Sequence, residues 1–309
     1  MTAPSPGPGP AATPVQEWWG TDGACVRYGD RLALDHVTFH TVPGRVSAVV
    51  GGDGAGRTTL LRCLAGALAV SDGQVRLPAP PRIGYLPAGS GIYPDLSVDE
   101  NLAFRATVYR LSPATARERS GELLDRAGLA AVRGRLAGQL SGGMRQKLGV
   151  IATMMHRPDL LVLDEPTTGV DPVSRADLWW LIARAAAGGA AVVLATSYLD
   201  EAERAVDVLA LDAGRVLASG TPEEIVAAMP GTLRVASAPP DGAARQRAWR
   251  RGGRWRIWDP AGQPGPGGPG EAGSALVPDL QDAVTVAILA RELSSTGNGD
   301  GRPERADPR

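Results

Sequence analysis

The sequence predicts an α/β protein with a largely parallel core sheet built around a phosphate-binding loop. The stretch VVGGDGAGRTTLLRCLAG (residues 49–66) passes from an apolar strand through a glycine-rich loop into a helical segment, which is the context in which such a loop binds phosphate. The stretch DLLVLDEP (159–166) is an apolar strand pattern that ends in two carboxylates. Helix, strand and hairpin patterns follow at 171–187, 190–197 and 207–220, and this alternation is typical of a parallel sheet crossed by helices.

Two further elements surround this core. Strand patterns separated by turn residues at 28–30 and 43–44 precede the loop and predict an antiparallel β edge. Between the loop and the strand that ends in two carboxylates, the pattern is helical. Ser97 and Glu100 form a capping box before an apolar run, and residues 114–129 form a second amphipathic segment. These segments predict a helical lobe.

Composition limits the classes of function. The chain has 309 residues, 43% of them hydrophobic, and a formal net charge of −1, which argues against bulk attraction to nucleic acid. The N-terminal residues contain neither a basic segment nor an apolar core, so we expect no signal peptide, and no apolar run is long enough to predict a membrane span. Of the two cysteines, Cys63 lies in an apolar, helix-like run far from Cys25, so a buried thiol is favoured over a disulfide.

The domain boundaries follow from shifts in composition. Residues 1–16 are rich in Pro and Gly and are predicted to be a disordered tail. A nucleotide-binding domain is expected over 17–230 and a small accessory region over 231–293, with a flexible Gly/Pro insert at 262–273. A second disordered tail is expected over 294–309.

The accessory region contains an unusual stretch, RQRAWRRGGRWRIW (245–258), with six Arg and three Trp residues. One interpretation is a surface that contacts nucleic acid or anionic lipid. The other is a hairpin that turns at Gly252-Gly253, with packed Trp and solvated Arg side chains. We favour the hairpin.

The glycine-rich loop supplies most of the candidate nucleotide-binding residues. Its glycines allow tight turns that point backbone N–H groups at phosphate oxygens, and the following helix adds the positive end of its dipole. The loop pattern G-x-x-x-x-G-K-[ST] is matched except at Arg57, which keeps the positive charge of lysine but carries a wide, planar guanidinium. A glycine-rich turn that binds nothing is the alternative, and the motifs that follow disfavour it. The candidates in the loop are Gly51, Gly52, Asp53, Gly54, Ala55, Gly56, Arg57, Thr58 and Thr59.

A metal and a catalytic residue are predicted next to the loop. Thr58 is placed to reach a magnesium ion, and Asp164 at the end of its strand is the expected second ligand. The next residue, Glu165, can orient or activate water and is the candidate catalytic base. The stretch LSGGMRQ (140–146) precedes this strand, and TTGVDP (167–172) follows it directly.

This order of motifs resembles the ATP-binding cassettes of ABC transporters. The resemblance covers roughly residues 17–230, and the wording of GIYPDLSVDENL, LSGGMRQKL and TTGVDPVSR is most similar to cassettes of drug-export systems with an ABC-2 type permease. It implies ATP and Mg²⁺ as cofactors, a cytoplasmic place on the inner face of the membrane, and two cassettes facing each other head to tail. Tyr28 matches the aromatic residue that stacks on adenine. The residues of the LSGGMRQ stretch that the resemblance assigns to the partner's ATP are Ser141, Gly142, Gly143 and Gln146, and Asp171 is a further nucleotide-site candidate.

Three positions depart from the family pattern. The family's lysine is Arg57, its lobe-joining glutamine matches Ala88, and its switch histidine matches Ser197. All three family residues contact the γ-phosphate region, so the resemblance implies an impaired hydrolytic site beside an intact LSGG motif. This combination predicts pairing with a different, complete cassette and slow or absent hydrolysis by the chain alone. The alternatives are that Arg57 is a tolerated change, or that the chain is a regulatory or scaffolding cassette. A soluble cassette protein that acts on ribosomes or DNA is disfavoured.

Overall fold

The computed structural model describes residues 17–260 and 274–296. The expected tail at 1–16, the insert at 262–273 and all but the first three residues of the tail expected at 294–309 lie outside the described residues. The centre of the molecule is a six-stranded sheet in the order β5-β6-β7-β3-β8-β9. Every neighbouring pair is parallel except β8 and β9, which form a hairpin. The predicted, largely parallel core is therefore confirmed. Its strands are β3 (Val46–Val50), β5 (Ile83–Leu86), β6 (Leu160–Asp164), β7 (Ala191–Ala195), β8 (Asp207–Asp212) and β9 (Arg215–Gly220).

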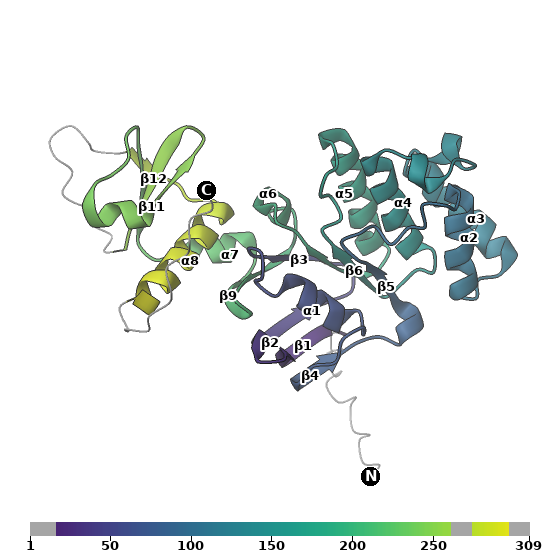
Figure 1. Cartoon of the computed structure of the whole chain (residues 1–309), viewed down its shortest axis with the longest axis horizontal. Coiled ribbons are helices and arrows are strands. Elements are labelled where there is room, and N and C mark those ends of the chain that lie inside the picture. The colour runs from purple at the N-terminus through teal and green to yellow at the C-terminus, as the bar shows by residue number, and fades with distance from the viewer. Residues whose placement is uncertain (1–16, 261–273, 297–309) are drawn as a thin grey trace, which may run out of the picture.

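An antiparallel sheet packs beside this core, as predicted. It consists of β1 (Trp19–Tyr28), β2 (Arg31–Thr41) and β4 (Asp72–Arg76), in the order β2-β1-β4. Helix α1 (Arg57–Leu64) shares one hydrophobic cluster with both sheets, and Figure 1 shows it directly above β1 and β2. Strand β4 escapes prediction because most of its residues are exposed, so they show no alternation of apolar and polar side chains.

The helical lobe lies at the far end of the core sheet (Figure 1). Ser97 caps α2 with Glu100 in the predicted capping box, and Ser112 caps α3. The apolar faces of these helices pack into the larger hydrophobic cluster of the domain, together with Leu148 and Ile151. The lobe and the neighbouring helix α5 comprise α2 (Val98–Val108), α3 (Pro113–Arg126), α4 (Gly142–Met154) and α5 (Pro172–Ala187), with 3₁₀ turns at Ala130–Val132 and Ala137–Gln139. A further 3₁₀ turn, Pro80–Arg82, directly precedes β5.

The C-terminal region forms a separate layer of sheet and helix beyond β9 (Figure 1). The short helix α7 (Pro222–Ala227) leads from β9 to a four-stranded antiparallel sheet in the order β11-β12-β10-β13, which packs on α8. Another short helix, α6 (Leu199–Ala202), lies earlier in the chain, between β7 and β8. Strands β11 and β12 form the predicted hairpin, and Gly252 and Gly253 both have positive φ at its turn. The remaining elements are β10 (Thr232–Ala236), a 3₁₀ helix (Gly242–Arg247), β11 (Ala248–Arg251), β12 (Arg254–Asp259), β13 (Ser274–Leu276) and α8 (Leu280–Thr296).

Arginines of this hairpin are paired within the fold. Asp282 at the start of α8 is fully buried and bonds to Arg251 and Arg256. A buried carboxylate requires such partners because an isolated charge in the interior is strongly unfavourable. The helix continues to Thr296, so its end lies three residues inside the segment predicted to be a tail from 294.

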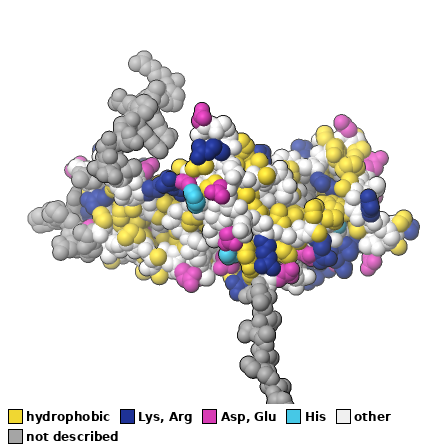
Figure 2. Space-filling view, turned by 90° about the horizontal axis from the view of Figure 1, so that it is seen from below, with side chains coloured by type: hydrophobic (Ala, Val, Ile, Leu, Met, Phe, Trp, Pro, Cys, Tyr) yellow, Lys and Arg dark blue, Asp and Glu magenta, His cyan; other side chains and the backbone are white. Residues whose placement is uncertain are grey.

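The surface charges and the state of the two cysteines agree with what the sequence predicts. Figure 2 shows acidic and basic side chains intermixed among hydrophobic ones on the face that it displays. Both cysteines are free and buried, and burial raises the pKa of the Cys63 thiol to about 11. Within residues 17–260 and 274–296, no helix combines the length and the apolar character that a membrane crossing requires.

Candidate nucleotide site

The phosphate loop joins the end of β3 to the start of α1, in the middle of the core sheet. Its backbone needs glycine at defined points. Gly54 and Gly56 have φ of 77° and 106°, a region that L side chains rarely adopt. A Cβ on Gly56 would also lie 2.7 Å from the backbone oxygen of Ala33. Because α1 begins directly after Gly56, its positive end and free N–H groups face the loop, as an anion site requires.

A cavity of about 460 Å³ opens over this loop, within the usual range for small-molecule sites. Tyr28, at the end of β1, contributes a side chain that is 46% exposed. The structure therefore brings together Tyr28 and most of the predicted loop residues, Gly51 excepted. It adds Arg31, which sequence reasoning missed although it lies only three residues from Tyr28. The lining residues are Tyr28, Arg31, Ala33, Gly52, Asp53, Gly54, Ala55, Gly56, Arg57, Thr58 and Thr59.

Asp164 and Thr58 form a pair that fits a magnesium ion. Asp164 ends β6 and is only 2% exposed, and its Oδ2 is buried with no hydrogen-bond partner among the described residues. Burial raises the pKa of this carboxyl, while a hydrogen bond from Thr58 lowers it. An orphaned, buried carboxylate oxygen beside a hydroxyl suits a hard divalent cation, which prefers oxygen ligands. These two residues would hold the ion.

We expect the replacement of Asp164 by Asn to raise the free energy of unfolding of the nucleotide-free chain, because the amide carries no charge to be buried at this position. The raised pKa of Asp164 means that its charged form opposes folding. This destabilisation is complete above the folded-state pKa and disappears as the pH falls below the ordinary value of 3.8. Urea unfolding at pH 7 without Mg²⁺ checks the effect, and the exposed Asp95→Asn variant serves as the control. An Asp164→Asn variant that is less stable than its parent would contradict this account.

Glu165 is held by an ion pair with Arg57. The Nη1 of Arg57 donates to Oε1 of Glu165 at 2.6 Å, and the side chains are only 12% and 16% exposed. Arg57 starts α1, and Glu165 follows β6 with a φ of 51°. In this arrangement the cation that should face the nucleotide is bonded to the candidate general base. The pair therefore occupies Oε1 of Glu165 with a hydrogen bond from Arg57.

The second oxygen of Glu165 is also engaged. Its Oε2 accepts hydrogen bonds from the Thr168 hydroxyl at 2.8 Å and from the backbone N–H and hydroxyl of Ser197, each at 3.3 Å. The structure therefore places the altered switch position beside Glu165. Ala88 follows β5 and is exposed, and its methyl group can neither bind a metal nor donate a hydrogen bond.

The LSGG segment forms the N-terminus of α4. Ser141 is its N-cap, with Oγ accepting from the backbone N–H of Met144 at 3.2 Å, and both Ser141 and Gly142 are exposed. Gly143 is buried against Asp171, where an added Cβ would lie 3.3 Å from the carboxylate. None of the described residues that line the loop cavity comes from 141–146. This exposed helix end is therefore separate from the chain's own phosphate loop.

Two predicted residues of this group have structural contacts of their own. Gln146 is buried, and its side-chain amide donates to the backbone oxygen of Glu165 at 3.4 Å. Asp171 is the N-cap of α5, and hydrogen bonds from the backbone of Ser174, the side chain of Ser174 and the backbone of Val173 lower the pKa of its carboxyl. Gln146 thus ties α4 to the strand end that carries Asp164 and Glu165.

Comparisons with known proteins agree with this geometry. The family model described as ABC transporter matches residues 34–168. The daunorubicin resistance ATP-binding protein DrrA3 of Streptomyces coeruleorubidus is 38% identical over 217 residues, which cover 67% of this chain and 69% of that protein. The Nod factor export ATP-binding protein I of Ralstonia nicotianae is 36% identical, with coverage of 72% and 71%. The probable multidrug ABC transporter ATP-binding protein YbhF of Escherichia coli is 40% identical over 66% of this chain, but the match spans only 37% of its length.

Solved structures establish the fold. A structure of the ATP-binding subunit of an ABC transporter is 27% identical, has a TM-score of 0.63, and covers 68% of this chain and 92% of its own. A dimeric, post-hydrolysis structure of the ATP-binding cassette MJ0796 with ADP and Pi has a TM-score of 0.61, coverage of 66% and 98%, and 20% identity. The fold is the phosphate-loop ATPase fold of ABC type.

Proposed function

The chain belongs to the ABC transporter family of ATP-binding proteins, and on this premise we propose that it is the ATP-binding subunit of an exporter of drugs or other small molecules. The relatives are named as multidrug transporter, daunorubicin resistance and Nod factor export ATP-binding proteins, which supports this class of cargo. The subunit would work from the cytoplasmic side, on the inner face of the membrane, bound to an ABC-2 type permease. Nucleic acid is not an expected partner, in keeping with a net charge of −1.

ATP would occupy the cavity over the phosphate loop. Tyr28 would stack on the base, the loop N–H groups and the start of α1 would bind the phosphates, and Arg31 would add a second cation. Thr58 and Asp164 would hold Mg²⁺, which supplies charge neutralisation on the phosphate oxygens. None of these contacts needs a lysine at position 57, so we expect ATP binding to be retained.

Hydrolysis at this site would be impaired, and the ion pair between Arg57 and Glu165 is the observation that carries this part of the proposal. For turnover, Arg57 would have to leave Glu165 and reach the γ-phosphate, and Glu165 would have to accept a proton from water. Ala88 and Ser197 offer no replacement for a metal-contacting amide or an imidazole. Ser141 and Gly142, by contrast, lie exposed at a helix N-terminus. The chain would therefore pair with a different, complete cassette and complete that partner's ATP site.

The same ion pair also favours a second candidate. A regulatory or scaffolding cassette would bind ATP, hold its dimer closed, and never complete hydrolysis. It differs from the exporter proposal in one respect, because its LSGG segment would not be needed for turnover by the partner.

Vesicle transport tests the proposal. We expect ATP-dependent accumulation of daunorubicin in inverted vesicles only when this chain, a complete second cassette and the permease are all present. Drug fluorescence measures the accumulation, and vesicles that contain any two of the three components are the controls. Unchanged transport without this chain, while the purified chain still binds a fluorescent ATP analogue, would support the regulatory candidate instead. Failure to bind the analogue would contradict both.

A further inference from the structure

A second cavity, of about 650 Å³, lies between the helical lobe and the core sheet. Residues just before β5, β6 and β7 form one wall, and α3, the end of α4 and the end of α5 form the others. The phosphate loop follows the carboxyl end of β3, which runs parallel to these strands. This cavity lies at the amino ends of the strands, whereas the nucleotide site lies at their carboxyl ends.

The lining is strongly basic. Five arginines face two carboxylates in this cavity. Each carboxylate already has a partner, since Arg82 bonds to Asp159 and Arg126 bonds to Glu122 at 2.5 Å. Three arginines therefore have no carboxylate partner among the described residues. These are Arg119, Arg157 and Arg184.

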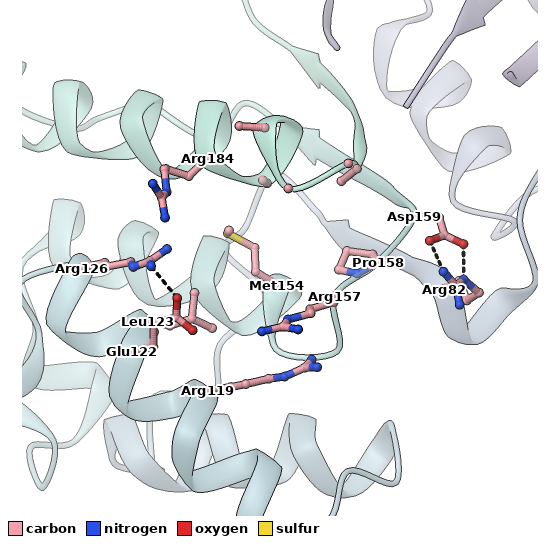
Figure 3. Close-up of a pocket in the computed structure, with 15 residues that line it drawn as sticks. Arg82, Arg119, Glu122, Leu123, Arg126, Met154, Arg157, Pro158, Asp159 and Arg184 are labelled. Atoms are coloured by element: carbon pink, nitrogen blue, oxygen red, sulfur yellow. Dashed lines mark hydrogen bonds and ion pairs between the residues drawn. The ribbon is translucent and has the colours of Figure 1, made fainter. Parts of the chain in front are cut away.

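The three guanidiniums come from separate segments. In the view of Figure 3 those of Arg119 and Arg157 lie near each other, and that of Arg184 lies on the other side of Met154, near Arg126. Arg119 lies on α3, Arg157 follows α4 with a φ of 50°, and Arg184 lies in the last turn of α5. Burial and the positive charge of Arg157 lower the pKa of Arg119. The charge of Arg157 thus disfavours the charged form of Arg119, and a negative charge in the cavity would stabilise both cations.

The fold compensates part of this charge. Arg119 donates to the backbone oxygen of Met155 at 2.7 Å, at the end of α4, and Arg184 lies at the end of α5. Each helix end carries roughly half a negative charge, which leaves an excess of about two positive charges. A phosphate group carries about −1.5 to −2 charges at neutral pH. At the rim, the ring of Trp180 lies 5.9 Å from the guanidinium carbon of Arg126 and 5.5 Å from that of Arg184, which limits their freedom.

We propose that this cavity binds a phosphate-bearing anion through Arg119, Arg157 and Arg184. Planar guanidinium groups bind phosphate oxygens in pairs of parallel hydrogen bonds, and the volume exceeds what one phosphate fills, so the ligand carries further atoms. The phosphate belongs either to a free phosphorylated small molecule or to an anionic lipid headgroup. Both sources present a phosphate to the same basic lining.

Titration calorimetry with inorganic pyrophosphate on the full chain tests the site. We expect the Arg157→Gln/Arg184→Gln double variant to bind at least about tenfold more weakly at this site, because hydrogen bonds to charged groups are the strong ones. Its matched control is the Arg110→Gln/Arg117→Gln double variant, which removes the same charge from exposed arginines of the helical lobe that do not line the cavity. The phosphate loop is unchanged in all of these proteins, so its own pyrophosphate binding stays constant. Equal weakening in both double variants, or in neither, would overturn the proposal.

Vesicle sedimentation distinguishes the two sources of phosphate. The site is assigned to a lipid headgroup if the chain cosediments with phosphatidylglycerol vesicles but not with vesicles of phosphatidylcholine alone. This cosedimentation must be lost in the Arg157→Gln/Arg184→Gln variant. The site is assigned to a free phosphorylated ligand if pyrophosphate binding depends on Arg157 and Arg184 and the chain does not bind vesicles. An oligoglutamate peptide that binds more tightly than pyrophosphate, and whose binding needs Arg157 and Arg184, would identify an acidic protein segment as the occupant. That result would overturn the assignment to phosphate.

Discussion

The Arg57→Lys/Ser197→His double variant is expected to hydrolyse ATP about 10²-fold faster than the unaltered chain. A lysine places a compact charge on the β- and γ-phosphates, and it lacks the wide fork that reaches Glu165 in this structure. A histidine at 197 would approach the same carboxylate that Ser197 now contacts. Each preorganised contact to developing charge is worth about 10²–10³ in rate, and contacts that act as a unit do not add. Phosphate release by the purified chain measures the gain.

Two additions make this test specific. Adding Ala88→Gln to the double variant is expected to raise the rate further, because an amide side chain can then reach the metal. Adding Glu165→Gln is expected to remove the gain, because the amide cannot accept a proton from water. If the unaltered chain already hydrolyses ATP as fast as the double variant, the ion pair with Arg57 does not impair the site.

Much of the site follows from local sequence. The glycine loop, and the strand that ends in Asp164 with Glu165 directly after it, are each set by residues that are close together in the chain, so their patterns predict their geometry. The hairpin at Gly252-Gly253 is of the same kind, because consecutive glycines permit the two positive φ angles of its turn.

Contacts between distant segments could not be predicted in this way. Arg57 and Glu165 are 108 residues apart, and only the packing of α1 against β6 brings their side chains into contact. The basic cavity draws Arg119, Arg157 and Arg184 from three different segments, and no window of sequence contains them together. The order of the C-terminal sheet, with β13 beside β10, likewise depends on non-local pairing.

A separate experiment asks which ATP the chain helps to hydrolyse. In a complex with a complete cassette, Ser141→Ala is expected to lower ATP turnover about 10²-fold, the effect of losing one preorganised donor at a transition state. The hydroxyl of Ser141 accepts one backbone N–H and keeps its own proton to donate to a phosphate on the partner. Arg57→Ala in the same complex is expected to leave turnover within about twofold, because the partner's phosphate loop carries out the reaction.

Ser112→Ala is the matched control for this experiment. Ser112 is also an N-cap serine of the helical lobe, and its hydroxyl accepts the backbone N–H of Thr115 at 3.1 Å. Loss of either cap destabilises its helix by about 1 kcal/mol, so the two variants should unfold at similar urea concentrations. Only Ser141 lies at the LSGG end of α4, so only its loss should affect turnover. Equal turnover in the two variants would mean that this chain does not complete its partner's site, and the regulatory candidate would then account for the ion pair at Glu165.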